Sequence, residues 1–404
     1  MTFVKNISSE QKTLLSLLGH GLFSAPLTIE PDVDWVGVAR EARAQAVFSV
    51  AFNNYKSLPL SDELSARVKA TLMKYALSAS ACFKNHSYLH GLMEKNGIPY
   101  CVVKGAASAS YYPDPILRAM GDVDFYVHPD EIDRAVKIFE GEGFERADMN
   151  HPSHIVLRNG AKHFEMHFKP VGYHDGWIGE MLLEYWKDIL ETSRMYQGEL
   201  AEFRGPSVFH HGFIMLTHLQ KHLVSEGVGL RHFCDWALFA SSLSNEEFVE
   251  TFESPLKRIG LFRLAQVLSL GAVKYLGMEY RAWMGDDYDT AEELLADIIY
   301  GGNFGRKDKQ RVYEGLFIVE RGTGDVKKGR IRMIFGSLNY IVDNHWRAAK
   351  KFPLLYPIGW VFFSMRYLIR VALGKRQMNL VDTYKKSGER KEKYSKLKAF
   401  EPEE

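Results

Sequence analysis

The sequence predicts an α+β fold, in which a small mixed-sheet core is flanked by N- and C-terminal helical domains. Apolar residues recur at helical spacing through most of residues 1–96 and again beyond residue 206. Between these regions the apolar residues form short continuous or alternating runs of strand length. We therefore divide the chain into a helical region (1–96), an α/β core (97–205), a helical domain (206–374) and a basic polar tail (375–404).

Composition is that of an ordinary soluble globular protein. Hydrophobic residues make up 46% of the 404-residue chain and charged residues 25%, and the net charge of +1 gives no signal of a nucleic-acid partner. Cys82, Cys101 and Cys234 lie far apart without CxxC spacing, which argues against disulfides and structural zinc. The first residues lack a signal-peptide pattern. These features predict a cytoplasmic location.

The first region contains three predicted helical stretches. Ser8 followed by Gln11 forms a capping-box pattern before a leucine-rich segment. Residues 34–54 and 61–95 also have apolar residues at helical spacing, and the longer stretch ends at Asn96-Gly97, a typical C-cap.

Two strands open the predicted core. Ile98–Val103 is a continuous apolar run, as expected for a central strand, and Asp122–Val127 is the second strand. One or two helical turns are expected within Gly105–Tyr112. An amphipathic helix is predicted to begin at His128-Pro129-Asp130 and to end near Gly141.

A β-hairpin follows. Asn159-Gly160 joins the strand-like runs 154–158 and 162–168, and this dipeptide favours a turn in which both residues have positive φ. On the second strand, His163, Glu165 and His167 share one face because side chains alternate.

Helical periodicity returns in the C-terminal domain, over residues 210–224, 231–243, 245–252 and 291–300. Ser244 with Glu247 and Thr290 with Glu293 are predicted capping boxes. Gly301–Gly305 resembles a phosphate loop, but it follows a helix and not a strand, so a turn is the better interpretation.

The segment Phe352–Leu373 is apolar and nearly long enough to cross a bilayer. Arg366 and Arg370 lie within it at four-residue spacing, and an arginine at mid-bilayer costs about 2.5–3.5 kcal/mol. We therefore predict an amphipathic helix that is buried or docks on the protein. Contact with a membrane surface is the alternative, and a spanning helix is the least favoured interpretation.

Asp122 and Asp124 carry the strongest chemical signal. They share a strand face, where two carboxylates repel unless a cation lies between them. With Glu165 from the later strand they predict a magnesium site, since Mg²⁺ prefers carboxylate oxygens. Simple surface solvation of Asp-x-Asp is the alternative.

Gly105 predicts a phosphate contact, because a glycine after a strand lets the backbone approach an anion. Lys104 and Arg118 add positive charge on either side. An ordinary strand-to-helix turn is the alternative interpretation of Gly105.

These residues together resemble a known family. The stretch VVKGAASASYYPDPILRAMGDVDFYV is similar to an uncharacterised bacterial nucleotidyltransferase family with a KG…R…DiD pattern, within the DNA polymerase beta-like superfamily. EMHFK (Glu165–Lys169) resembles that family's EiHw-type strand, and HLQKHL and LRHFCDWALF (Leu230–Phe239) also resemble it.

The resemblance implies transfer of a nucleoside monophosphate from a nucleoside triphosphate, ATP by default, to an unknown acceptor. It implies that Asp122, Asp124 and Glu165 are catalytic ligands of two Mg²⁺ ions, with Mn²⁺ as an alternative. Lys104, Gly105, Ala106 and Arg118 are implied to bind the nucleotide. Ala106 replaces the superfamily's usual Gly or Ser. An inactive nucleotide- or protein-binding module is therefore one alternative. The apolar segment Phe352–Leu373 and the basic tail make a membrane-surface accessory protein another.

Further residues are candidates for the cleft lining: His167, Lys169, His218, His222, Arg231 and Asp235. His218 and His222 are four apart on a helix and are alternatively a metal-binding pair. Arg231 and Asp235 are alternatively a helical ion pair, and the two interpretations stand about evenly.

Overall fold

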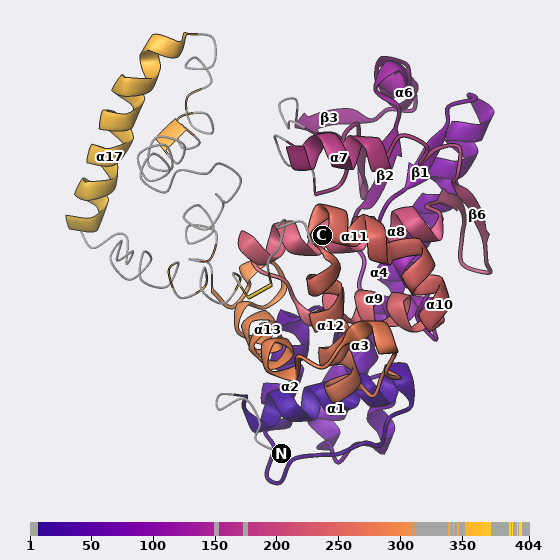
Figure 1. Cartoon of the computed structure of the whole chain (residues 1–404), viewed down its shortest axis with the longest axis vertical. Helices are drawn as coiled ribbons and strands as arrows, with labels where there is room; N and C mark the ends of the chain where they lie inside the picture. The colour runs from indigo at the N-terminus through magenta and orange to yellow at the C-terminus, as the bar shows by residue number, and fades with distance from the viewer. Residues whose placement is uncertain are drawn as a thin grey trace.

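The computed structural model describes residues 7–148, 153–172, 177–308 and 352–372, together with a few separate residues between 311 and 397. It has the predicted α+β fold, with a mixed sheet and flanking helices (Figure 1). The sheet lies above a body of helices in this view, and helix α17 stands apart.

The main sheet has five strands in the order β1-β2-β5-β4-β3. β2 and β5 are parallel, and the other neighbours are antiparallel, so the sheet is mixed. The strands are β1 (Tyr100–Val102), β2 (Val123–Val127), β3 (Glu145–Asp148), β4 (His154–Asn159) and β5 (Lys162–His167).

The predicted hairpin is confirmed as β4 and β5, but its turn differs from the expected one. Asn159 pairs with Lys162, so the loop residues are Gly160 and Ala161. Gly160 has φ +57°, and neither Asn159 nor Ala161 is among the described residues with positive φ. A positive φ at the first loop position alone is typical of a type II′ turn, which needs glycine there. The expectation of two positive φ angles was wrong.

The two faces of the sheet have different chemistry. One face packs against α4 (Asp62–Lys95) and α6 (Ile132–Gly141), and its side chains form an aromatic core in which Phe125, Phe139 and Phe164 are fully buried. Alternation along the strands sends Asp124, Glu165 and His167 to the opposite face. The apolar core thus fixes which side chains face the helices on the other side.

Helices from both ends of the chain share one hydrophobic core. Among the described residues, helices from the predicted regions 1–96 and 206–374 therefore pack together, whereas α17 contributes nothing to this core. The helices of this body are α1 (Ser9–Phe23), α2 (Trp35–Ala44), α3 (Phe48–Ala51), α8 (Val208–Val224), α9 (Leu230–Ser241), α10 (Asn245–Phe248), α11 (Ser254–Ile259), α12 (Phe262–Leu276) and α13 (Tyr288–Gly301). Helix α7 (Trp177–Tyr185) and the hairpin β6 (Arg194–Gln197) and β7 (Glu202–Gly205) connect the sheet to this body.

Helix α12 was missing from the sequence prediction. Its side chains are buried on nearly every side, as Leu264, Ala265, Val267, Leu268 and Leu270 show. Only Arg263, Gln266, Val273, Lys274 and Tyr275 are not buried, so the polar stripe of this helix is narrow and its 3.6-residue period is hard to recognise in the sequence.

Two of the three predicted capping boxes are present, and the third is not. The boxes Ser8/Gln11 and Ser244/Glu247 are both present. Helix α13, by contrast, begins a turn earlier than predicted, because the Thr290 N–H donates to Asp287 Oδ1 at 3.1 Å. Asp287 is therefore the N-cap, and the predicted box Thr290/Glu293 was wrong.

Helix α17 (Tyr356–Ala372) follows a 3-10 turn at Pro353–Leu355 and confirms the predicted helix in Phe352–Leu373. One face of this segment is exposed: Leu354, Ile358, Val361, Phe362, Met365 and Ile369 are between 53% and 90% exposed. On another side, Gly359 is buried against Val342, and the Trp360 Nε1–H donates to Asn339 Oδ1 at 2.9 Å. Within the described residues, no helix combines the length and the apolar character that crossing a membrane requires.

Most of the predicted tail, 375–404, lies outside the described residues. Arg390, Tyr394 and Leu397 are nevertheless buried. The Tyr394 hydroxyl donates to Asp297 Oδ2 at 2.6 Å, and Arg390 donates to the Leu223 carbonyl at 2.9 Å. A basic polar tail is expected to be solvated, and these three residues are packed against the protein instead.

The cap assignment predicts unequal effects of two substitutions at the start of α13. Asp287→Ala removes the cap and an ion pair with Arg263, and we expect it to lower the free energy of unfolding by about 0.5–2 kcal/mol. Glu293→Gln changes an exposed ion pair with Lys396 and should stay within about 0.5 kcal/mol. Urea denaturation of both variants measures the difference, and equal losses would contradict the assignment.

Candidate active site

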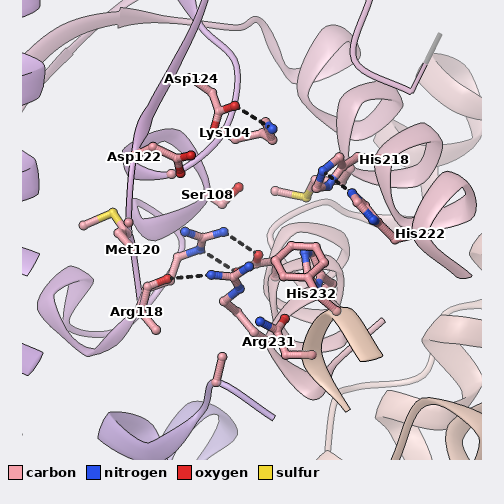
Figure 2. Close-up of a pocket in the computed structure, with 18 of the residues that line it drawn as sticks. Lys104, Ser108, Arg118, Met120, Asp122, Asp124, His218, His222, Arg231 and His232 are labelled. Atoms are coloured by element: carbon pink, nitrogen blue, oxygen red, sulfur yellow. Dashed lines mark hydrogen bonds and ion pairs between the residues drawn. The ribbon is translucent and has the colours of Figure 1, made fainter. Parts of the chain in front are cut away.

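A cavity of about 550 Å³ lies between the polar face of the sheet and the helices α8 and α9 (Figure 2). Its lining includes most of the residues predicted from the sequence: Lys104, Gly105, Arg118, Asp122, Asp124, Glu165, His218, His222, Arg231 and Asp235. Ala106 and His167 are buried behind the wall, and Lys169 follows β5 outside the lining.

Strand pairing brings the three acids to one end of this cavity. Asp124 on β2 is the register partner of Glu165 on the parallel strand β5. Asp122 precedes β2 by one residue, and two-residue spacing places it on the same side as Asp124. All three line the cavity.

Asp124 is buried but strongly stabilised as a carboxylate. Burial opposes its ionisation, but the Lys104 ammonium, 2.6 Å from Oδ1, and His167, with Nε2 3.0 Å away, hold its pKa well below the usual value. Because an ionised carboxylate only accepts hydrogen bonds, His167 Nε2 is the donor.

The pKa of Glu165 shifts in the opposite direction to that of Asp124. Burial, then the charges of Asp124 and Asp122, raise its pKa to about 8. Lys104 contacts Asp124 and leaves the combined negative charge of the three acids only partly compensated. A divalent cation bound by carboxylate oxygens would remove this repulsion, so the residues present fit the ion that the sequence predicts.

Gly105 turns the chain from β1 into the short helix α5 (Ala106–Ala109). Its φ of +61° and ψ of −109° form a conformation that favours glycine, and a Cβ there would lie 3.5 Å from His86 Nε2. Ser108, one turn further, lines the cavity, with Oγ 3.2 Å from His211 Nε2. Sequence reasoning missed Ser108, although it lies within the quoted motif.

Arg118 is held in a buried ion pair. Its Nε and one terminal nitrogen donate to the two oxygens of Asp235 at 2.8 and 2.7 Å, and the Tyr112 hydroxyl donates to the same carboxylate at 2.8 Å. Of the two interpretations of Arg231 and Asp235, the helical ion pair is not observed among the described residues, since Asp235 pairs with Arg118.

Arg231 is the less compensated of the two arginines. It donates to the Ala119 carbonyl at 3.2 Å, and its Nε has no hydrogen-bond partner. Burial, followed by repulsion from Arg118, lowers its pKa to about 10. The carboxylate of Asp235 pairs with Arg118, so the charge of Arg231 leaves net positive charge at the cavity.

Three histidines form another part of the wall. The Nε2 atoms of His218 and His222 on α8 are 2.9 Å apart, and the ring centre of His232 on α9 lies 5.6 Å from that of His218. Burial lowers the pKa of all three side chains, and nearby positive charges, among them Lys104 for His222 and Arg231 for His232, lower it further. His232 was not predicted, because only the packing of α8 on α9 brings it there.

The glycine-rich segment 301–305 is a turn, as predicted, and it also contributes to the site. Phe304, with φ +53°, lines the cavity, and its ring centre lies 4.8 Å from that of His222 and 5.3 Å from that of His232. Arg306 lines the same edge. Neither residue could be assigned from the sequence, since the segment is far from the motif.

Carboxylates at one end and basic groups along the wall are typical of a cavity for a cation and a phosphorylated substrate. Comparison with family models defines the class: residues 31–277 match an uncharacterised nucleotidyltransferase family. Because the match covers more than half of the chain, the protein belongs to this family. No curated protein matches the chain. Membership indicates nucleotidyl transfer as the general activity.

The buried pair of Arg118 and Asp235 predicts a large loss of stability on neutralisation. Asp235→Asn leaves the Arg118 charge buried without its carboxylate, and we expect a loss of about 3–5 kcal/mol in the free energy of unfolding. Glu94→Gln removes an exposed partner of Arg204 and should cost less than about 1 kcal/mol. Denaturant titration of both proteins compares them; a similar small cost in each would show that the Arg118 pair is not a structural constraint.

Proposed function

We propose that the protein is a magnesium-dependent nucleotidyltransferase that moves a nucleoside monophosphate from a nucleoside triphosphate to an acceptor. The observation that carries this proposal is the convergence of Asp122, Asp124 and Glu165 on a cavity that Lys104 and Arg231 also line. Family membership supports the nucleotidyl transfer. ATP is the default donor, and Mn²⁺ is the alternative ion.

The three carboxylates are the proposed ligands of two metal ions. When bound, the ions lower the pKa of the attacking group and neutralise charge on the departing pyrophosphate. The acceptor attacks the α-phosphorus and loses a proton, while the bond from that phosphorus to the pyrophosphate oxygen breaks. The protein positions both reactants for in-line displacement.

The remaining wall residues are the proposed nucleotide site. Gly105 lets the backbone approach the phosphates, and Lys104 and Arg231 supply positive charge. Ser108 offers a hydroxyl close to Ala106, where the superfamily hydroxyl is lost. Arg118, held by Asp235, keeps the wall in place and is proposed to act on the phosphates only at longer range.

The inactive-module alternative is less well supported, because the three acids are all present at the cavity and Ser108 lines it. We also propose a cytoplasmic location, which fits three free cysteines that are all buried.

The enzymatic proposal predicts that Asp122→Asn and Asp124→Asn each lower pyrophosphate release from labelled ATP, GTP, CTP or UTP by at least about 100-fold, or about 2.7 kcal/mol of transition-state stabilisation. Asp130→Asn changes an exposed aspartate beyond β2 and is the control. Calorimetric titration with a non-hydrolysable nucleotide, with and without Mg²⁺, gives a readout that needs no acceptor. Unchanged magnesium-dependent binding and turnover in Asp124→Asn would contradict the metal assignment.

A second candidate function, attachment to a membrane surface, is favoured by α17. Its exposed apolar side chains recur at three- and four-residue spacing: Leu354, Ile358, Val361, Phe362, Met365 and Ile369. Lys350 and Lys351 precede the helix in the sequence, and Lys375 and Arg376 follow it. Apolar side chains with flanking basic residues suit a helix lying in an anionic membrane interface.

We expect the full chain to co-sediment with vesicles that contain phosphatidylserine, and less with pure phosphatidylcholine. Val361→Glu combined with Ile369→Glu should abolish this binding, since both side chains are exposed and the change need not disturb folding. Leu77→Glu, an exposed leucine on α4, is the matched control. Equal sedimentation of all three proteins would exclude a role for α17.

A further inference from the structure

Two histidines lie beside Glu165, outside the lining of the cavity. His154, Glu165 and His167 each offer a ligand atom, and these atoms lie within 4.8 Å of one another. His154 on β4 is the register partner of His167 on β5, and Glu165 lies two residues before His167 on the same face. The antiparallel hairpin therefore builds the cluster.

The distances suit coordination of one ion. Glu165 Oε2 is 3.9 Å from His154 Nε2 and 4.0 Å from His167 Nε2. With metal–ligand bonds of about 2.1 Å, two ligand atoms on one ion lie at most about 4.2 Å apart. Both separations between Glu165 and a histidine are within this limit. The side chains of His154, Glu165 and His167 are 14%, 20% and 7% exposed, and Glu165 lines the cavity. A cation would therefore enter the cluster from the side of Glu165.

The donor set selects the kind of ion. Imidazole nitrogen binds first-row transition ions well, whereas Mg²⁺ prefers oxygen ligands and retains water. We propose that the metal position at Glu165 is a mixed site of His154, Glu165 and His167 that selects a transition ion, represented by Mn²⁺, over Mg²⁺. Asp122 and Asp124 remain oxygen-only ligands. This inference rests on the proposed function in taking Glu165 as a metal ligand.

Coordination requires one proton to move. His167 Nε2 donates to Asp124 in the structure, so binding of an ion through Nε2 places the ring proton on Nδ1 and leaves the imidazole neutral. Asp124 loses this hydrogen bond but keeps the Lys104 ammonium. The mixed site can therefore fill while Lys104 still holds Asp124, without nucleotide.

The test uses the full chain without nucleotide and adds Mn²⁺ alone. We expect electron spin echo modulation from coordinated nitrogen, and Mn²⁺ binding at least about tenfold tighter than Mg²⁺ binding by calorimetric competition. His154→Gln and His167→Gln should each weaken Mn²⁺ binding about tenfold and leave Mg²⁺ binding nearly unchanged. His128→Gln removes an exposed histidine beyond β2 and is the matched control.

Absence of nitrogen coupling in the wild-type protein would overturn the inference, and this measurement does not depend on the folding of any variant. Equal Mn²⁺ affinity in the wild type, His154→Gln and His167→Gln would also overturn it. Nitrogen coupling in a protein that turns over no nucleotide would support the mixed site and count against the proposed function. Loss of turnover in Asp124→Asn, together with absence of nitrogen coupling in the wild type, would support the proposed function and count against the mixed site.

Discussion

The parallel pairing of β2 and β5 is the constraint on which the site depends. It sets Asp124 directly beside Glu165, although 40 residues of chain separate the two acids. The two carboxylates repel each other when both are ionised. Packing on the opposite face of the same strands offsets this repulsion, because Phe125 and Phe164 are fully buried in an aromatic core. The strands cannot slip by one residue to relieve the charge, since a slip would turn those rings toward the polar face.

The charged side chains of the sheet and of the helices are unevenly distributed around the cavity. Lys104 neutralises part of the acidic end, whereas Asp235 on α9 neutralises only one of the two arginines beside the opposite wall. The result is a cavity with excess negative charge at one end and excess positive charge at the other, which suits a cation and a polyphosphate together. Because helices from both ends of the chain share a core, the two ends of the cavity are held at a fixed separation.

Local sequence patterns predicted much of this arrangement. Contacts between residues far apart in the sequence could not be predicted in this way. Alternation along strands was enough to place Asp122 and Asp124 together, and the hairpin signal supplied Glu165. The partner of Asp235 is Arg118, 117 residues earlier, and no spacing within α9 could reveal it. His232 and Phe304 reach the cavity only because α9 and the glycine-rich turn pack beside α8. Helix α12 was not predicted because most of its residues are buried and its polar stripe is narrow.

The position of Lys104 links metal binding to nucleotide binding. Its ammonium contacts the carboxylate that, in the proposed reaction, holds an ion, so the two positive charges compete for Asp124. Among the described residues, Glu165 forms no ion pair with an ammonium group, and the nitrogen atoms of His154 and His167 lie beside it. In the proposed reaction, an ion at Glu165 would therefore not need to displace Lys104, whereas an ion at Asp124 would. A triphosphate would supply the negative charge that draws the ammonium away. On this proposal, filling of the second metal position and arrival of the nucleotide would be coupled.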